Sequence, residues 1–430
     1  MKRGIRKGGL FAVLALVAVL GLSAAAAAAI PSQGVCYNVR NSKLYDKNNV
    51  APAINETVAK MKDGDRLYLQ SGNYRFKETI KLAKDKDRLK NCTIVLEGVY
   101  TMDGSFDAML IDGDFLNVEI GTVTSGRTGD DYKTQGKLPG GIKFRQTDYS
   151  DFTFGTVSGF DYGLRFSPQK TKTGECYNKF RFGAITHCYA GLNLNTEGTD
   201  TGDKSPAWVN ENAFYGGKIA NVTYGVLAKK GKNQIDEYNN NSFWNIRFEK
   251  VTKDAIFCEF SAFNSFIKPV FSEIGGFYLN QKASSKGNTF TIEAKTSISK
   301  LAFYSKGDIV KAPLTDASGA VVASELTTTN LKSAASVKKG FTLTNKKDMT
   351  AGPGTTNLPL NIGTVNVSSA SGAVTLRTDA NASFENNSFM LRVTGYGKAI
   401  QVNNLAGKIT SAGTYKIIYM GGEWRAVKLS

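Results

Sequence analysis

Carboxyl side chains occur in three polar stretches in the middle of the chain, residues 167–177, 195–211 and 229–240. Two carboxyl groups can hydrolyse a glycosidic bond when one is protonated and the other is ionised. They stand about 5 Å apart when the configuration is retained and roughly 6.5 to 9.5 Å apart when it is inverted. The candidate catalytic residues are Glu175, Glu197, Asp200, Asp203, Asp236 and Glu237.

Aromatic and basic side chains accompany these carboxyl groups. Aromatic rings pack on sugar rings, and Lys or Arg side chains pair with acidic substituents, so the mixture is typical of a sugar-binding groove. The candidate substrate-binding residues are Arg165, Lys172, Tyr177, Trp208, Lys229 and Tyr238. Polar side chains also populate ordinary solvated loops, so each of these residues has a purely structural alternative.

A second cleavage reaction, β-elimination on a uronate, has different requirements. The sugar carboxylate must be neutralised by Ca²⁺ on Asp or Glu ligands, or by Lys and Arg, and a Lys, Arg or Tyr side chain must act as the base. The composition, 54 Lys and Arg against 37 Asp and Glu, favours an acidic polysaccharide as the partner. The sequence assigns no metal ligands, and Ca²⁺ is a cofactor of this reaction alone.

A repeat in the same region indicates how these residues are positioned. The triplet Asn-x-Phe begins at Asn178, Asn212, Asn241, Asn264 and Asn288, and Ser150 takes the equivalent earlier position. A unit of about 23 residues with three short strands cannot bury its own apolar face, but stacked units share one core. The repeat therefore predicts an all-β fold, a right-handed parallel β-helix, in which the asparagines form a hydrogen-bonded ladder at one corner.

The intervals between the repeats are unequal. They are 28, 34, 29, 23 and 24 residues, so the first three units are longer than the others. The extra residues fall in the three polar stretches. Because stacked units keep their corners aligned, we expect three neighbouring loops that form a groove on one side of the coil.

Residues 51–62 read as a short amphipathic helix, and short strands follow it. This part of the chain, with GDRLYL at 64–69 and SGNY at 71–74, resembles the opening of the pectate-lyase-like right-handed β-helix superfamily. The resemblance extends over residues 45–300 and implies that the helix caps the open end of the coil. The superfamily includes polysaccharide lyases, hydrolases, epimerases and tail-spike proteins, so the resemblance does not imply one reaction.

The catalytic motifs of that superfamily are missing from the chain. There is no Trp-Ile-Asp-His block, no Gly-His-Gly and no Arg-Ile-Lys, and the single histidine, His187, is expected to be a structural turn residue. Two functions from different classes therefore stay open. One is a polysaccharide lyase or glycoside hydrolase, and the other is a non-catalytic surface protein, adhesin-like or tail-spike-like, that binds carbohydrate.

The chain begins like an exported protein. Four basic residues precede an apolar run over 10–22 and an alanine run over 24–29, which predicts a secretory signal peptide at residues 1–29. No other segment is long and apolar enough to span a membrane, so we expect a secreted, cell-surface or periplasmic protein. The positive charge is scattered in single residues, and a nucleic-acid partner is not expected.

Composition divides the rest of the chain. Residues 30–310 are assigned to the β-helix, 311–340 to a linker or loosely packed edge, and 341–430 to a smaller β-sandwich-like module for attachment or for assembly of a homotrimer. The five cysteines allow one or two disulfides with a thiol left over. Cys188 and Cys258 lie in apolar strand patterns and are expected to be buried.

Overall fold

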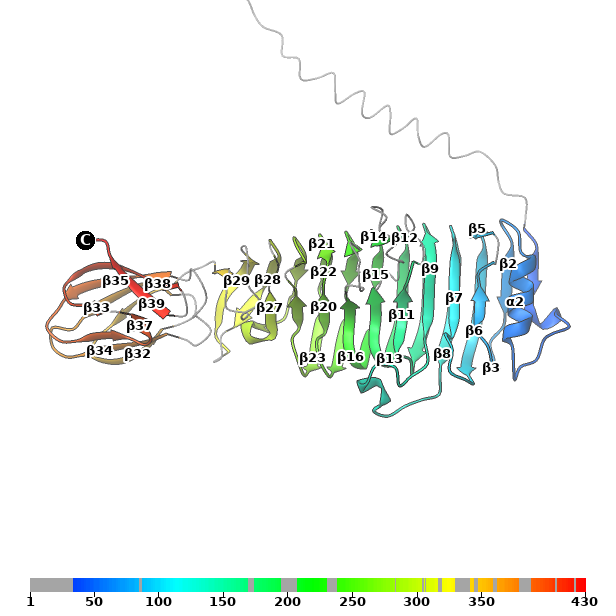
Figure 1. Ribbon diagram of the computed structural model, residues 1–430, viewed down its shortest axis with the longest axis horizontal. Helices are drawn as coiled ribbons and strands as arrows, with labels where there is room; N and C mark the ends of the chain where they lie inside the picture. Colours follow the sequence, from blue (N-terminus) through cyan, green and yellow to red (C-terminus); the bar gives the residue numbers. More distant parts are fainter. Residues whose placement is uncertain are drawn as a thin grey trace, which may run out of the picture.

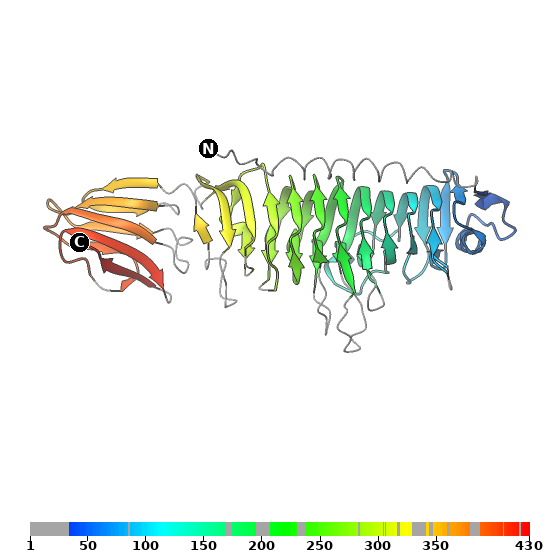
Figure 2. The same cartoon turned by 90° about the horizontal axis from the view of Figure 1, so that it is seen from above.

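The computed structural model describes residues 34–430 except 85–86, 169–173, 195–206, 230–237, 283, 304, 306, 316–318, 329–340, 344–346, 359–361, 379–387, 407 and 421–422. The predicted signal peptide lies outside these residues. The described part is almost entirely β-structure. Its strands stack into an elongated coil, and a separate group of strands follows at the C-terminal end (Figures 1 and 2).

One α-helix, α2 (Ala51–Lys60), lies at the N-terminal end of the coil (Figure 1). It begins with Pro52 in its first turn, where the missing N–H of proline costs no helical hydrogen bond. Ile54 and Val58 are fully buried on the face that meets the coil. The predicted capping helix is confirmed, because it removes the apolar face of the first rung from water.

Three parallel sheets run along the coil, and several long strands bend from one sheet into the next. The first sheet contains β1 (Cys36–Asn38), β2 (Arg66–Leu69), β15 (Ala213–Tyr215), β18 (Ser242–Trp244), β22 (Ser265–Ile267), β25 (Thr289–Thr291) and the starts of β6 (Thr93–Met102), β8 (Asn117–Thr124), β10 (Asp151–Ser158) and β13 (Lys179–Leu194). The second contains β3 (Asn73–Phe76), β19 (Arg247–Val251), β23 (Val270–Ile274), the start of β16 (Lys218–Ala228) and the later parts of β6, β8, β10 and β13.

The third sheet carries the site described below. It contains β4 (Ile80–Leu82), β7 (Met109–Asp114), β9 (Ile142–Asp148), β11 (Tyr162–Phe166), β20 (Ile256–Cys258), β24 (Leu279–Gln281), β27 (Leu301–Phe303) and the ends of β13 and β16. Short strands follow it at the next corner: β5 (Leu89–Lys90), β12 (Gly174–Cys176), β14 (Trp208–Asn210), β17 (Tyr238–Asn239) and β21 (Ser261–Ala262). The predicted parallel β-helix is therefore confirmed.

The Asn-x-Phe repeat builds the inside of the first sheet. The phenylalanines are buried and stack with ring centroids 4.4 to 5.0 Å apart, in the order Phe152, Phe180, Phe214, Phe243, Phe266 and Phe290. The asparagine before each of the last five is also buried. In the first four of these asparagines the side-chain amide donates to the amide oxygen of the next one at 3.0 to 3.1 Å. The predicted ladder is confirmed. Stacked burial stabilises the coil by about 1.5 to 3 kcal/mol for each phenylalanine.

The ladder ends on a carboxylate, Asp308, which accepts from the backbone N–H of Asn288 at 2.7 Å and from the hydroxyl of Ser305. Burial raises the pKa of Asp308 to about 6, although both hydrogen bonds act to lower it. In the folded protein this group therefore holds its proton more tightly than in the unfolded chain. Its contribution favours folding at low pH and is lost as the pH rises through about 6.

We expect Asp308→Asn to remove this pH dependence. The amide keeps an oxygen acceptor for Asn288 and carries no charge, so the variant should be more stable than the wild type at pH 7 by about 2 to 3 kcal/mol. Below pH 4 the two proteins should be equally stable. Chemical denaturation at a series of pH values measures the difference, and the exposed Asp103→Asn serves as the control. Parallel pH profiles for wild type and Asp308→Asn would contradict the prediction.

The coil closes where the direction of pairing reverses. Strand β28 (Ile309–Thr315) is parallel to β25 and antiparallel to β29 (Val321–Thr328), which pairs antiparallel with β30 (Phe341–Leu343). The short β26 (Thr296–Ser297) also pairs with β28. Of the segment expected as a linker or loosely packed edge, the described residues up to 328 thus form edge strands of the coil.

The C-terminal module consists of two facing sheets, as the predicted β-sandwich-like module requires. One contains β31 (Lys347–Ala351), β33 (Ile362–Ser368), β35 (Ser388–Gly395), β37 (Leu405–Ala406), β38 (Gly413–Met420) and β39 (Glu423–Lys428), and the other contains β32 (Gly354–Leu358), β34 (Val374–Thr378) and β36 (Ile400–Val402). Trp424 is fully buried between them and donates to the hydroxyl of Thr378 at 3.1 Å. Strands β31, β33 and β35 pair in parallel, which the sequence did not indicate.

The described residues 36, 92, 176, 188 and 258 are free cysteines, so the structure contains none of the disulfides that the sequence allowed. Cys188 and Cys258 are buried as expected, and burial raises the pKa of both thiols to about 12. These thiols are neutral near pH 7. They act as small apolar side chains in the core.

Candidate functional site

The three polar stretches start side by side on the third sheet. Leu164 of β11 is in register with Leu192 of β13, which is in register with Val226 of β16. The polar stretches begin just after the ends of these neighbouring strands. Half of the twelve candidate residues lie outside the described residues, and their positions stay predictions: Lys172, Glu197, Asp200, Asp203, Asp236 and Glu237.

Glu175 is the one candidate catalytic residue that the structure describes. It belongs to β12, is fully buried and accepts a hydrogen bond from the hydroxyl of Thr147. Burial raises the pKa of Glu175 well above its ordinary value. A polymer outside the coil does not reach this side chain in the structure.

Three of the aromatic candidates occupy the corner next to β12. Tyr177 is exposed and its ring stacks in parallel on Tyr149, with centroids 4.8 Å apart. Trp208 donates to the thiol of Cys176 at 2.8 Å, and Tyr238 is fully buried. Stacking on Tyr149 covers one face of the Tyr177 ring, and Tyr177 is still 48% exposed.

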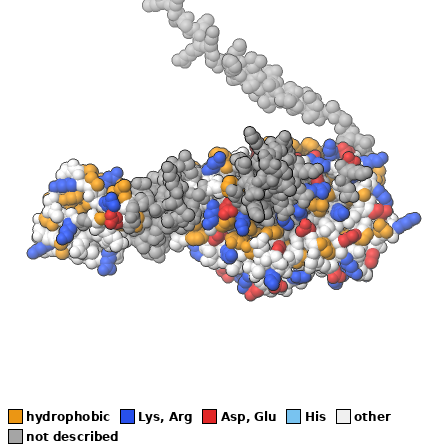
Figure 3. All heavy atoms as spheres, viewed as in Figure 1, with side chains coloured by type: hydrophobic (Ala, Val, Ile, Leu, Met, Phe, Trp, Pro, Cys, Tyr) orange, Lys and Arg blue, Asp and Glu red, His pale blue; other side chains and the backbone are white. Residues whose placement is uncertain are grey.

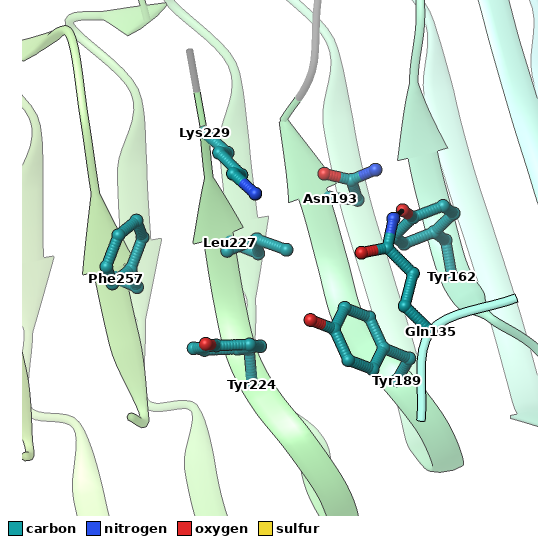
Figure 4. A pocket seen from close by; sticks show the side chains of 8 residues that line it. All are labelled: Gln135, Tyr162, Tyr189, Asn193, Tyr224, Leu227, Lys229 and Phe257. Carbon is teal, nitrogen blue, oxygen red and sulfur yellow. Dashed lines mark hydrogen bonds between the residues drawn. The ribbon is translucent and has the colours of Figure 1, made fainter. Parts of the chain in front are cut away.

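A pocket of about 270 Å³ lies instead on the outer face of the third sheet (Figure 4). Its lining combines aromatic rings with amides and one cation, from Gln135, Tyr162, Tyr189, Asn193, Tyr224, Leu227, Lys229 and Phe257. Two of the sequence candidates are brought together here. Lys229 lines the pocket, and the guanidinium of Arg165 lies over the ring of Tyr162 at 5.3 Å from its centroid.

The pairing register creates this pocket. Asn193, Leu227 and Phe257 occupy the same position in β13, β16 and β20, so their side chains follow one another along the coil. Side chains alternate between the two faces of a strand. The residues next to these three face the core, so these three side chains lie on the outer face of the sheet. Successive strands are about 4.8 Å apart, so the pocket extends along the coil axis.

The four pocket rings meet edge to face. The centroids of Tyr162 and Tyr189 are 6.4 Å apart at 78°, those of Tyr189 and Tyr224 are 5.7 Å apart at 73°, and those of Tyr224 and Phe257 are 5.8 Å apart at 64°. In such a row no ring lies flat against the next one. All four rings line the pocket, where a sugar ring can contact them.

Burial raises the pKa of each of the three pocket tyrosines, Tyr162, Tyr189 and Tyr224. Their hydroxyls stay protonated at neutral pH, so they donate and accept hydrogen bonds but are poor bases. Among the described residues that line the pocket there is no carboxyl group. The described lining therefore lacks the acid–base pair that glycoside hydrolysis needs.

Cations surround the rings of the pocket. The ammonium of Lys253 lies 5.5 Å from the ring centroid of Tyr224, and that of Lys282 lies 5.2 Å from the ring centroid of Phe257. With Arg165 and Lys229, each end of the pocket has cationic side chains. The charges of Arg165, Lys253 and Lys282 thus lie over aromatic rings of the pocket.

Three neighbouring carboxylates, Asp161, Asp254 and Glu259, offset this charge only in part. Asp161 accepts from the backbone N–H groups of Gly136 and Leu138, and Asp254 accepts from the side chain of Asn280 at 2.8 Å and from a backbone N–H. Both carboxylates are mostly buried. Glu259 follows β20 at the register position between Lys229 and Lys282, and four cations still outnumber it.

One wall of the pocket is a segment that the sequence interpretation did not single out, residues 125–141, which we call the strap. It contains a short 3-10 helix, η3 (Asp131–Lys133), and its Gln135 amide donates to the hydroxyl of Tyr162 at 2.6 Å. The spacing of the rungs indicates that this rung has an insertion. Asn117 is in register with Asp151, an interval of 34 residues that equals the longest interval of the repeat.

Fold and site together define an elongated parallel β-helix protein with an aromatic, cation-rimmed pocket on one sheet. No family model matches the chain, and no curated protein matches it. A search of solved structures gives a distant likeness to PfbA, a surface adhesin of Streptococcus pneumoniae, with a TM-score of 0.42 and 10% identity over 92% of this chain and 99% of that chain. A likeness this distant assigns no function.

Two further properties concern metals and membranes. Within the described ranges, no group of three or more His, Cys, Asp and Glu residues is placed to hold a metal ion. In the same part of the chain, no helix has the length and apolar character needed to cross a bilayer.

Proposed function

We propose that this protein is an exported, non-catalytic β-helix protein that binds an acidic polysaccharide in the pocket of the third sheet. The composition of the pocket carries the proposal. Its edge-to-face rings suit the apolar faces of sugar rings, Asn193 and Gln135 suit their hydroxyl groups, and the flanking cations suit carboxylate or sulfate groups. This combination is the one expected of a carbohydrate-binding surface.

The local charge supports an acidic rather than a neutral ligand. Basic and acidic side chains are interspersed over the face of the molecule in Figure 3, so that face has no single large charged patch. At the pocket, in contrast, Arg165, Lys229, Lys253 and Lys282 gather around four rings. Such a local excess attracts an anionic chain over about one Debye length, roughly 8 to 10 Å at moderate salt.

Binding without cleavage accounts best for the described residues. Glu175 is buried and its pKa is raised, and the pocket tyrosines keep their protons. The remaining candidate acids, in 195–206 and 230–237, stay predictions for a lyase or hydrolase. Membership of the pectate-lyase-like superfamily and export through residues 1–29 are likewise proposals that rest on the sequence.

The proposal is tested by incubating the mature protein with a panel of acidic and neutral polysaccharides. We expect binding to acidic members, measured by calorimetry, with no new reducing ends and no ultraviolet absorbance from an unsaturated product. Product in either assay would restore the enzyme interpretation. Absence of binding to every acidic polysaccharide, or equal binding to charged and neutral ones, would contradict the proposal.

Removing one flanking charge should weaken binding in a salt-dependent way. In Lys282→Met the apolar stem over Phe257 is retained and the charge is lost, so we expect about two- to fivefold weaker binding at low salt. The difference should vanish near 1 M salt, where the Debye length is about 3 Å. Lys77→Met, at an exposed position of the N-terminal region, is the matched control. A loss of affinity that persists in high salt would contradict the electrostatic role.

A further inference from the structure

Besides the hydrogen bonds at its two ends, the strap contacts three consecutive rungs at residues that lie close to a pocket tyrosine in the sequence. Its anchors on the coil are Asp161, His187 and Thr223. Asp161 directly precedes Tyr162, Thr223 directly precedes Tyr224, and His187 lies two residues before Tyr189. The strap therefore reaches the backbone that positions all three tyrosines.

The strongest anchor is Asp161. Its carboxylate accepts from the backbone N–H of Gly136 at 2.7 Å and from that of Leu138 at 3.3 Å. Its own backbone N–H donates to the carbonyl of Pro139 at 2.8 Å. One residue of the coil thus binds three peptide groups of the strap, within residues 135–140. Bonds from backbone N–H groups to a carboxylate are among the stronger hydrogen bonds in proteins.

The other end of the strap is held at the next two rungs. The buried hydroxyl of Thr223 donates to the carbonyl of Tyr132 at 2.9 Å. The ring of Tyr132 meets the imidazole of His187 edge to face, with centroids 5.9 Å apart. His187 has a φ of 53°, in the left-handed region, so the chain bends at this contact just before Tyr189. The single histidine therefore has the structural position that the sequence led us to expect.

We propose that the strap preorganises the binding site, in that its anchors hold the three tyrosines in the edge-to-face row that accepts the polysaccharide. The expected effect on affinity rests on the proposed function. The positioning of the tyrosines by the strap does not. A preorganised row binds without the cost of ordering its side chains on contact with ligand. Asp161 and Thr223 are then positioning residues, since neither lines the pocket.

Two conservative substitutions test the anchors. In Asp161→Asn the amide nitrogen cannot accept a hydrogen bond, so one of the two strap N–H groups loses its partner. In Thr223→Val the donor to Tyr132 is removed while the shape is kept. We expect each variant to bind an acidic polysaccharide about five- to tenfold more weakly, and the core of the coil to unfold at the wild-type denaturant midpoint. Thr153→Val, an exposed position on β10, is the matched control.

A second measurement needs no ligand. Hydrogen exchange of the backbone amides at 187–190 and 222–225 should become faster in both variants and stay unchanged in Thr153→Val. Cleavage of the native protein by trypsin after Lys133 and Lys137 should become faster in parallel. If exchange and cleavage match the wild type in both variants, the anchors do not hold the strap and the inference is wrong.

The two proposals fail in distinguishable ways. If the strap loosens but the polysaccharide binds with unchanged affinity, preorganisation is contradicted while the binding function stands. If the wild type binds no acidic polysaccharide, the proposed function fails. Hydrogen exchange then still decides whether the strap positions the tyrosines.

Discussion

Replacing Tyr224 by alanine is expected to weaken the binding of an acidic polysaccharide by about tenfold or more. Tyr224 stands between Tyr189 and Phe257 in the row of rings, and Lys253 lies over it. The substitution therefore removes the ring surface that contacts the ligand, the ring contacts with Tyr189 and Phe257, and the cation–π contact with Lys253. Central aromatic residues of binding sites commonly contribute about 2 kcal/mol or more, which corresponds to a factor of about thirty.

Tyr224→Phe separates the ring from its hydroxyl. It keeps the edge-to-face contacts and the cation–π contact, so binding should weaken by no more than about threefold. Tyr149→Ala is the matched control, because Tyr149 is an exposed tyrosine that stacks in the corner outside the pocket. Titration calorimetry with one acidic polysaccharide compares the three variants. Equal affinities for Tyr224→Ala and the wild type would show that the pocket is not the binding site.

The second large effect concerns the stability of the coil. In Asn241→Ala the ladder loses the oxygen that accepts from the backbone and side chain of Asn212, both at 3.1 Å. It also loses the donor to Asn264 at 3.0 Å and to the carbonyl of Val209 at 2.8 Å. Each buried polar group left without a partner costs about 1 to 3 kcal/mol. We expect the variant to be destabilised by about 4 kcal/mol.

Denaturant unfolding measures this loss, and Asn117→Ala, at an exposed position of β8, provides the control. Stacked repeats interact mainly with their neighbours, so the region around the substituted rung should open first. Hydrogen exchange of 212–214 and 264–266 should reveal this opening. A loss of less than about 1 kcal/mol would mean that water or neighbouring groups satisfy the ladder, and its stabilising role would be overturned.

The sequence was sufficient for the fold because Asn and Phe recur at the same places in five successive rungs, from Asn178 to Phe290. Asn212 and Phe214 have equivalents one rung earlier at Asn178 and Phe180, and burial of the column follows from the spacing alone. The C-terminal module has no such repeat, and its parallel pairing was not foreseen. What the sequence did not predict is the pairing register between distant strands. No local pattern specifies that register when each strand contributes a different residue type.

The pocket could not be predicted for the same reason. Tyr189, Tyr224 and Phe257 come from three strands and share no motif, and only the pairing brings them into one row. Glu175 shows the opposite error, a residue that was predicted to belong to the site and does not line the pocket. It stands beside a polar stretch in the sequence, but the alternation of β12 turns it into the core and leaves Cys176 on the other face. Polarity alone did not separate these two environments.

Ring geometry, rather than residue type, distinguishes the two aromatic groups of the coil. Tyr149 and Tyr177 stack at 12°, whereas Tyr189 and Tyr224 meet at 73°. Both pairs contain tyrosines in neighbouring rungs. From the sequence we predicted Tyr177 as a binding residue and did not predict Tyr189. The second arrangement lines a pocket, and its flanking cations supply the charge that an acidic sugar requires.

The most direct test of the central claim is one incubation of the mature protein with a defined acidic oligosaccharide, followed by measurement of both the bound fraction and the mass of the ligand. The account predicts that the wild type binds the oligosaccharide, that Tyr224→Ala does not at the same concentration, and that the recovered ligand has its original mass. A shortened or unsaturated ligand would identify an enzyme. Equal retention by the wild type and Tyr224→Ala would place binding elsewhere, and either result would contradict the account.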